Sequence, residues 1–554
     1  MRWSWQLLEG CVECEADVKD SGRVAILLFV FLASLYFLTL RLPPTGGDDR
    51  TMLAVAIALV EEGRFDLDPE FNPTGGVRGR ENRVYSKYPI GQSLAEIPFY
   101  FAGKALSRLF VSETPVWGLE SARRAFAAQC VVGLPALLTA GTCVLFFYLC
   151  LRLGATVQTA LVASLLLGVG SILWPYSGSL LSEPLQTFLL VLTVYLVRVH
   201  ITQGRFRALL AGGLAFGALV AVRPNMVLVL PVLWAYVILG SRLPVAWRGV
   251  ACAALVPGLA VGLAVTLGYN WLRFGQWLQF GYVGERFSSP MYTGLWAYVF
   301  SPGRSVLLYS PVLVVAAAGV REFWRRHRPE AVLVWGSVAV LALFYAKWHS
   351  WSGAHCWGPR FLMPVVPFSM LSSVWVLEGW RHSLRRWHRV AIVALVAAGI
   401  LVQVPGVAID PLFYYHVVFG MTTDVTVHHL LGDCIDFVPH FSPLAGNTWL
   451  LGWSMVRLLS ERWVNADAVV SSAPWAAIRP SWRPEFPMGA LRVQQWYAMY
   501  RAVVPGVGFG AVLAYLCVAG FGFLASVVLI ALWWRRRVEA EGVVRPCVLP
   551  CCDD

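Results

Sequence analysis

Apolar runs long enough to cross a bilayer dominate this chain. A membrane-spanning helix needs about 20 predominantly apolar residues, with a range near 17–25. Only 14% of the residues are charged, against about 25% in a typical soluble domain. We therefore expect an all-α, polytopic membrane protein with about 12 transmembrane helices. The predicted spans are 24–42, 124–150, 156–176, 184–200, 208–222, 225–241, 250–271, 305–320, 331–346, 361–378, 390–408 and 504–534.

The basic residues predict the orientation of these helices. The formal net charge of +12 is gathered mainly in short loops between the apolar runs: Arg205 and Arg207, Arg321 to Arg328, Arg381 to Arg389, and Arg535 to Arg537. Lys and Arg are enriched in cytoplasmic loops, so both termini are predicted to be cytoplasmic, in the cell inner (plasma) membrane. No groove-reading motif accompanies the charge, which argues against a nucleic-acid partner. The first 23 residues lack a small-residue cleavage site, so the first helix is expected to remain as an anchor.

This topology divides the chain into five parts. We expect a cytoplasmic N-terminal segment at 1–23 and a transmembrane module at 24–408, whose first extracytoplasmic loop, 43–123, carries amphipathic juxtamembrane helices. An extracytoplasmic region at 409–503, a last transmembrane helix at 504–534 and a cytoplasmic tail at 535–554 complete the chain. The long loops all fall on one face, which favours a reaction at the outer membrane surface.

Acidic residues in the predicted outer loops are candidates for catalysis. Asp48 and Asp49 stand side by side in "GGDDRTMLAVAIALVEEG", at the start of a short helix, and Glu183 precedes Pro184 at the start of another. Acids at helix N-termini are often caps or dipole partners. One cap needs one Asp, however, and a carboxylate beside the membrane can also act as a general base on an acceptor.

Cationic side chains in the same loops suggest an anion site. Lys87 lies between Tyr85 and Tyr88 in "RVYSKYPIGQS", as an interfacial Lys with aromatic neighbours or as a point charge for a phosphate. The outer segments also hold arginines that run against the positive-inside pattern: Arg273, Arg286, Arg304 and Arg360. His355 can bind a metal or an acceptor, although a lone His usually does neither.

The cysteines give no clear framework. "CVEC" (Cys11, Cys14) and "CVLPCC" (Cys547, Cys551, Cys552) lie in predicted cytoplasmic ends, where reduced thiols are favoured over a zinc site. Cys356 and Cys434 fall in outer loops, where a disulfide is compatible with the compartment but is not established by sequence.

Seven segments taken in order resemble one family, the GT-C superfamily of multi-pass membrane glycosyltransferases, related to protein O-mannosyltransferases and lipid A aminoarabinose transferases. They are "GGDDRTMLAVAIALVEEGRFDL", "YSKYPIGQSLAEIPFY", "LWPYSGSLLSEPL", "NWLRFGQWLQFGY", "SPGRSVLLYSP", "WSGAHCWGPRFLMPVVP" and "HFSPLAG", between residues 46 and 446. The resemblance implies a GT-C-like fold with its active site at the extracytoplasmic membrane surface and a polyprenyl-phosphate sugar donor.

The resemblance also implies roles for individual residues. Asp48 falls at the family's catalytic Asp, and Asp49 replaces the Glu that usually follows it. Glu183 falls at a second acid, and Lys87 lies in an element like the family's Lys-Pro-Pro segment near the donor phosphate. From their positions in the outer segments, and not from the resemblance, Arg273, Arg304 and Arg360 are further phosphate-binding candidates, and Tyr85, Tyr88 and His355 are expected to line the substrate cavity. Transfer would invert the anomeric carbon.

The leading hypothesis is thus a glycosyltransferase that moves a sugar to a glycan, lipid or protein acceptor among membrane lipids. It needs no nucleotide-binding domain, and the chain has no Rossmann fingerprint or P-loop. No cofactor is required and no metal ligands are assigned, although paired acids can hold a divalent cation. A transporter or flippase of lipid-linked sugars, and a non-catalytic envelope assembly protein, are the alternatives. The lack of an internal repeat weakens the transporter alternative.

Overall fold

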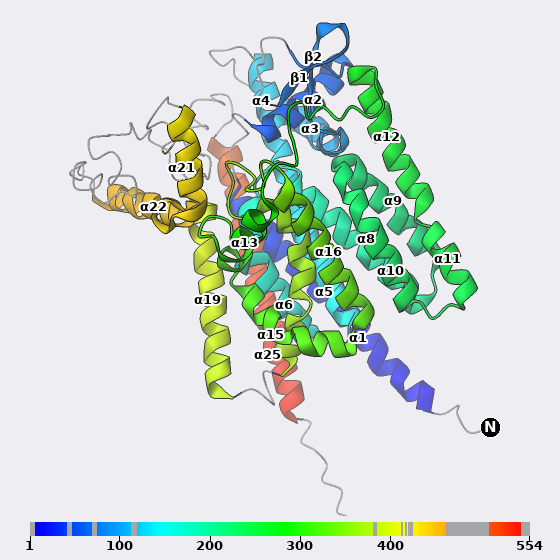
Figure 1. Cartoon of the computed structure of the whole chain (residues 1–554). Coiled ribbons are helices and arrows are strands. Elements are labelled where there is room, and N and C mark those ends of the chain that lie inside the picture. The colour runs from blue at the N-terminus through cyan, green and yellow to red at the C-terminus, as the bar shows by residue number, and fades with distance from the viewer. Residues whose placement is uncertain are drawn as a thin grey trace, which may run out of the picture.

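The protein is a bundle of helices with one small β-hairpin, as seen in a computed structural model (Figure 1). The structure describes residues 6–40, 47–68, 75–111, 119–379, 385–410, 414–415, 418, 425–460 and 509–543. The terminal cysteines Cys547, Cys551 and Cys552 lie outside these ranges, and so do residues 461–503 of the predicted outer region 409–503. All structural statements below concern the described residues.

The long helices form the body of the bundle. They are α1 (Gln6–Leu38), α4 (Leu119–Val131), α5 (Gly133–Arg152), α6 (Val157–Gly170), α8 (Glu183–Gln203), α9 (Phe206–Val222), α10 (Leu230–Gly240), α11 (Val245–Ala253), α12 (Val256–Phe274), α15 (Val312–Arg326), α16 (Arg328–Lys347), α19 (Arg386–Ala408) and α25 (Phe509–Val543). Shorter helical pieces join them: α7 (Leu173–Tyr176), η2 (Pro224–Val229), α13 (Met291–Phe300), α14 (Val306–Tyr309), η3 (Arg360–Val365), α17 (Val366–Met370) and α18 (Ser373–Glu378).

Seven stretches of the described helices are long and apolar enough to cross a membrane. They are Asp20–Leu38, Glu120–Arg152, Glu183–Gln203, Val245–Phe274, Arg328–Lys347, Arg386–Ala408 and Tyr515–Val538. Three shorter apolar helices accompany them, at Val157–Gly170, Phe206–Val222 and Pro224–Gly240. The prediction of a helical membrane protein therefore agrees with the structure. The predicted count of about 12 spans is not confirmed, because seven stretches of the described helices meet the criteria of length and apolarity. The predicted span 361–378 is built from the short pieces η3, α17 and α18.

One end of the bundle carries the helices and hairpin of the first long loop, and we call it the loop face (top of Figure 1). It consists of α2 (Asp48–Glu62), the antiparallel strands β1 (Gly76–Arg78) and β2 (Val84–Ser86) with the turn η1 (Arg80–Asn82) between them, α3 (Gly91–Phe110), and the start of α4. Val77 pairs with Tyr85 in the hairpin. The beginning of α1 and the end of α25 lie at the opposite end of the bundle (Figure 1).

Helices α9 and α12 touch backbone to backbone. A Cβ atom on Gly217 would overlap the carbonyl group of Gly258, and one on Gly262 would overlap Gly217 in the same way. Small residues at such positions are typical of closely packed membrane helices. Helix α9 then ends at Arg223, because Pro224 cannot continue the hydrogen-bond ladder, and the 3₁₀ turn η2 follows. The predicted spans 208–222 and 225–241 are thus separated by a break in the helix at Arg223 and Pro224.

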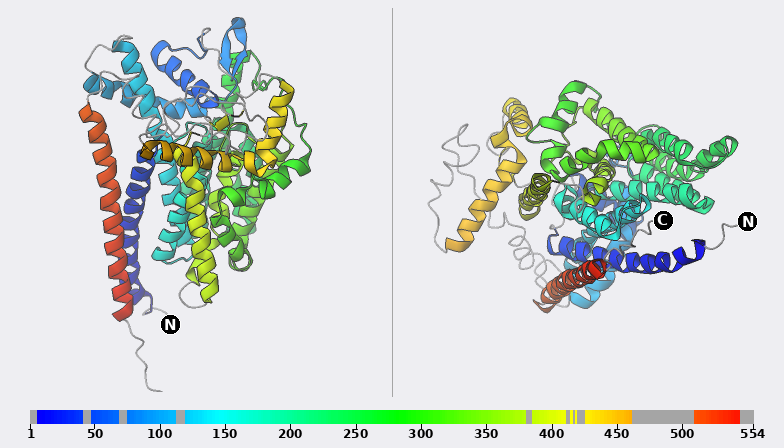
Figure 2. Two further views of the ribbon diagram at one scale, coloured as in Figure 1. Left: turned by 90° about the vertical axis from the view of Figure 1, so that its left-hand side faces the viewer. Right: turned by 90° about the horizontal axis from the view of Figure 1, so that it is seen from below.

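Two further packing units frame the bundle. Helices α1 and α25 run side by side along it, and at their lower end Arg537 forms an ion pair with Asp20 at 2.9 Å (Figure 2). At the other side, α21 (Val425–Phe437), η4 (Pro439–Phe441) and α22 (Pro443–Ser460) form a small apolar cluster of their own with Ile409, Tyr414 and Tyr415.

Candidate functional site

The acid pair occupies the first turn of α2. Gly47 is the N-cap residue, with a φ of 95° that favours glycine, and no side chain caps the helix. Asp48 and Asp49 both follow it inside the helix, where their charges suit the positive end of the helix dipole. Neither acid occupies the cap position, because the chain enters the helix at Gly47.

Asp48 lies at the meeting point of three separate loops. Its Oδ1 accepts a 2.6 Å hydrogen bond from the hydroxyl of Tyr88, and its Oδ2 lies 3.2 Å from Nη2 of Arg360. Burial acts to raise the pKa of Asp48, but the charges of Arg360 and Lys87 and the bond from Tyr88 outweigh it, so the pKa lies below its ordinary value. Asp48 is thus a carboxylate at neutral pH.

Glu183 approaches the same arginine from the start of α8. Its side chain is 3% exposed, and its Oε1 lies 3.8 Å from Nε of Arg360, too far for a hydrogen bond. Within the described part of the chain, the buried Oε2 of Glu183 and the Nε of Arg360 have no hydrogen-bond partner. A buried carboxylate that lacks partners is costly. The unpartnered Oε2 of Glu183 therefore suits a ligand that supplies hydrogen-bond donors.

Arg223, Tyr282 and Tyr345, which the sequence motifs did not single out, complete this cluster. Arg223, at the end of α9, interacts electrostatically with Tyr345, Tyr282 and Glu183. The ring of Tyr345 stacks on Phe361 with centroids 4.3 Å apart, and its hydroxyl accepts a bond from Asn225. Arg223 is a charged residue between two apolar segments, and a charge in that position is a sequence signal of function that could have identified it.

Lys87 forms an ion pair on the rim of the cluster. Its Nζ lies 2.7 Å from Oε1 of Glu285, whose other oxygen lies 3.2 Å from Nε2 of His349. The ammonium also stands 5.3 Å from the ring centroid of Tyr88 and 5.8 Å from that of Tyr282. An anion bound at Lys87 must therefore compete with Glu285. Glu285 directly precedes the candidate Arg286 and was not itself predicted to be a site residue.

Arg273 and Arg304 hold loops in place. The buried Arg273 donates to the backbone carbonyls of Ser86 and Tyr88 and to Oδ1 of Asn270, which fixes the segment around Lys87. Tyr85 packs beside it, against Phe274.

The equally buried Arg304 forms an ion pair with Asp436 at 2.7 Å and donates to the carbonyl of Ala354 and the hydroxyl of Tyr415. The phosphate role predicted for Arg273 and Arg304 stays a prediction. The guanidinium groups named above already donate hydrogen bonds to groups of the protein.

The remaining predicted residues lie around these contacts. His355 stacks on Tyr415 with ring centroids 4.8 Å apart. Cys356 and Cys434 are both free thiols, so no disulfide joins them here. In the described ranges, no group of three or more His, Cys, Asp or Glu side chains is arranged to hold a metal ion.

Asp49 lies near a second buried acid. Glu96 of α3 is fully buried and accepts a 2.9 Å bond from Gln92, which also donates to the carbonyl of Leu180. Burial raises the pKa of Glu96 well above its ordinary value, and the charge of Asp49 raises it further. The charge of Asp49 thus acts on another acid, whereas the charge of Asp48 is paired with Arg360.

No family model and no curated protein sequence matches this chain. Among solved structures, it is similar to the archaeal oligosaccharyltransferase AglB from Archaeoglobus fulgidus in complex with an inhibitory peptide and a dolichol-phosphate, at 16% sequence identity and a TM-score of 0.29. The match covers 93% of this chain and 51% of AglB, so the chain spans about half the length of that protein. At this level of likeness, a function has to be argued from the residues of the chain itself.

Proposed function

We propose that this protein is a membrane glycosyltransferase that moves a sugar from a lipid-phosphate donor to an acceptor, with Asp48 as the general base. The loop face would then be the extracytoplasmic face of the membrane. The observation that carries the proposal is the ionised Asp48 carboxylate, held by Tyr88 and Arg360 next to the partly unpartnered Glu183. The ordered sequence segments that resemble GT-C enzymes support the same conclusion.

The reaction needs few chemical parts. An acceptor hydroxyl or amine attacks the anomeric carbon from the face opposite the phosphate, and its proton passes to Asp48. The bond between the anomeric carbon and the phosphate oxygen breaks, and the bonding electrons leave with the lipid phosphate. Attack from the opposite face inverts the anomeric carbon.

The cations of the cluster would stabilise the leaving group. Arg223, Arg360 and Lys87 together balance the three acids Asp48, Glu183 and Glu285, so the free site is close to neutral. Exchange of Glu285 for a phosphate at Lys87 would transfer a charge-assisted contact to the donor. Positive groups fixed in advance are favourable where charge develops in the transition state. Glu183 would accept hydrogen bonds from sugar or acceptor hydroxyls at its buried Oε2.

Asp48→Asn tests the proposal. The donor class is first identified by mass spectrometry of lipids that copurify with the full chain, and turnover is then measured in reconstituted vesicles. Removing a general base lowers the rate about 10²–10⁴-fold. We expect a loss of turnover in this range with unchanged donor binding, because the amide keeps the shape of the carboxylate. Asp49→Asn is the matched control and should retain most of the activity.

Two results would contradict the proposal. Normal turnover by Asp48→Asn would exclude this residue as the base. Movement of intact lipid-linked sugar across the vesicle membrane, with no transfer to any acceptor by the wild-type protein, would identify a transporter instead.

A further inference from the structure

A second polar pocket opens on the loop face at the far end of α2. It has a volume of about 400 Å³ and is lined by Glu61, Lys104, Ser107, Arg108, Glu120, Ser121, Arg123 and Arg124. Asp48 and Glu61 stand at opposite ends of the same helix, roughly 20 Å apart at about 1.5 Å of rise per residue. The pocket is therefore separate from the Asp48 cluster and belongs to no step of the proposed reaction.

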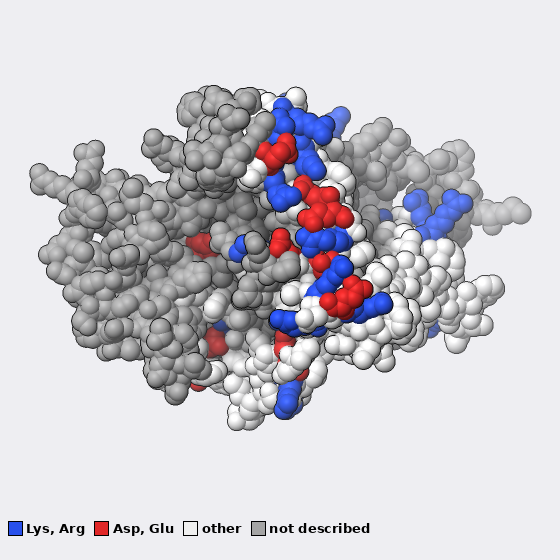
Figure 3. Space-filling view, turned by 90° about the horizontal axis from the view of Figure 1, so that it is seen from above, with Lys and Arg blue, Asp and Glu red and all other residues white. Residues whose placement is uncertain are grey.

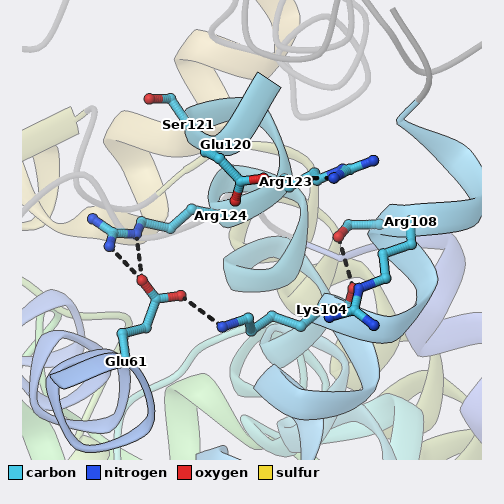
Figure 4. A pocket seen from close by; sticks show the side chains of 8 residues that line it. Glu61, Lys104, Arg108, Glu120, Ser121, Arg123 and Arg124 are labelled. Carbon is cyan, nitrogen blue, oxygen red and sulfur yellow. Dashed lines mark hydrogen bonds and ion pairs between the residues drawn. The ribbon is translucent and has the colours of Figure 1, made fainter. Parts of the chain in front are cut away.

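Glu61 pairs with two of the four cations that line this pocket. Glu61 accepts a 2.7 Å bond from Tyr100 and pairs with Lys104 at 3.3 Å and, more closely, with Arg124. Burial acts to raise the pKa of Glu61, but these donors outweigh it, so its pKa lies below the ordinary value and the carboxylate stays charged. Figure 4 shows Glu61 between Arg124 and Lys104, with Arg108 and Arg123 on the far side of the pocket.

Arg108 and Arg123 are the cations that remain available. Arg108 forms no ion pair with any described residue. The single partner of Arg123 in the described ranges is Glu120, at 3.5 Å, and that side chain is 90% exposed. The Nε of Arg123 is buried and has no partner in the same ranges. Exposed pairs of this kind contribute little, about 0.2–1 kcal/mol. The pocket thus has spare guanidinium donors and an excess of positive charge.

The apolar surroundings point to a ligand that is anchored in the membrane. On α3, Lys104, Ser107 and Arg108 face the pocket, while Phe101, Leu106 and Leu109 of the same turns are 54%, 41% and 75% exposed. A helix with a basic face and an exposed apolar face is typical of the membrane interface. Figure 3 shows the acids and bases of this face gathered in one band, with uncharged surface beside it.

We propose that this pocket binds the phosphate headgroup of an anionic phospholipid, with Arg108 and Arg123 as its main ligands. The phosphate would sit between these two guanidinium groups, beside the first turns of α4. The acyl chains would lie along Phe101 and Leu109. The lipid would serve as a fixed neighbour of α2, α3 and α4, and no bond is made or broken in it.

The experiment compares lipid binding by the full chain and by Arg108→Gln/Arg123→Gln. Purified, delipidated protein is titrated with phosphatidylglycerol and with phosphatidylcholine of the same acyl chains, and bound lipid is measured by native mass spectrometry. Each basic side chain near an anionic lipid surface contributes roughly a fivefold factor in affinity. We expect the wild type to prefer phosphatidylglycerol, and the double variant to bind it about 25-fold more weakly. The control Arg78→Gln/Arg80→Gln removes two arginines from the hairpin on the same face and should bind as the wild type does.

Three outcomes would overturn the proposal. The first is equal affinity of the wild type and the double variant for phosphatidylglycerol. The second is equal binding of phosphatidylcholine and phosphatidylglycerol by the wild type. The third is binding of inorganic phosphate or glycerol phosphate as tight as that of the intact lipid, which would identify a site for a soluble phosphate. Should the double variant fail to fold, Arg108→Gln alone carries the test, because its side chain holds no described ion pair, and we expect a fivefold loss.

Discussion

Replacing Arg360 by Gln should raise the pKa of Asp48. In the wild type, Arg360 opposes the effect of burial, and without it only the bond from Tyr88 and the charge of Lys87 still lower the pKa. An opposite charge within about 4–6 Å lowers a carboxyl pKa by roughly 1–3 units, and each unit corresponds to about 1.4 kcal/mol. Because the Asp48 side chain is 32% exposed, solvent screening favours the low end of this range of pKa shifts. We therefore expect an upward shift of roughly one unit.

Infrared difference titration of the purified protein measures this pKa directly. The Asp48→Asn variant identifies which part of the carboxyl signal belongs to Asp48. Arg83→Gln is the control, since it removes an arginine of the loop face whose ion pairs are to Asp66 and Glu81. An Asp48 titration that is the same in the wild type and in Arg360→Gln would refute the assigned ion pair.

The same shift has a consequence for activity and for stability. Because the folded-state pKa of Asp48 is lowered, its stabilising contribution is present above the ordinary carboxyl pKa and is lost as the pH falls through the folded-state value. A base with a lowered pKa also stays deprotonated further into the acid range. We expect the acid limb of the pH–rate profile to move to higher pH in Arg360→Gln, in step with the infrared titration.

Two further predictions concern the ion pairs of the loops. Lys87→Ala should weaken donor binding, whereas Glu285→Gln should strengthen it by removing the competing carboxylate, as measured by donor titration; equal effects of the two changes would exclude the proposed exchange. Arg304→Met should leave Asp436 buried without its partner and lower the free energy of unfolding by about 3–5 kcal/mol, as measured by chemical denaturation in detergent. An unchanged denaturation midpoint in Arg304→Met would show that this ion pair does not hold the two loops together.

The helical membrane fold could be predicted from the sequence because apolar length is a local property. Asp48, Glu183 and Arg360 could be selected in the same way, since each is a charged residue at the end of an apolar run. Their mutual contacts could not be predicted, because the residues are separated by more than a hundred positions and meet only when η3 packs against α8 and Arg360 reaches Asp48.

The omissions have the same physical origin. In the sequence, Glu285 is a polar loop residue without a motif around it, and its contact with Lys87 is seen only in the folded chain. The roles of Arg273 and Arg304 also depend on partners from distant segments. From the sequence alone, a single arginine in a loop can bind an anion or donate to backbone carbonyls. Only the folded chain distinguishes these two roles.

The glycine contact between α9 and α12 has an effect that extends beyond those helices. Arg223 terminates α9, and Arg273 in the last turn of α12 holds the carbonyls of Ser86 and Tyr88. The distance at which Gly217 and Gly258 let the two backbones meet therefore sets how far Arg223 stands from the tyrosine that holds Asp48. The spacing of the polar groups on the loop face is thus determined in part by the absence of Cβ atoms at Gly217, Gly258 and Gly262 inside the apolar bundle.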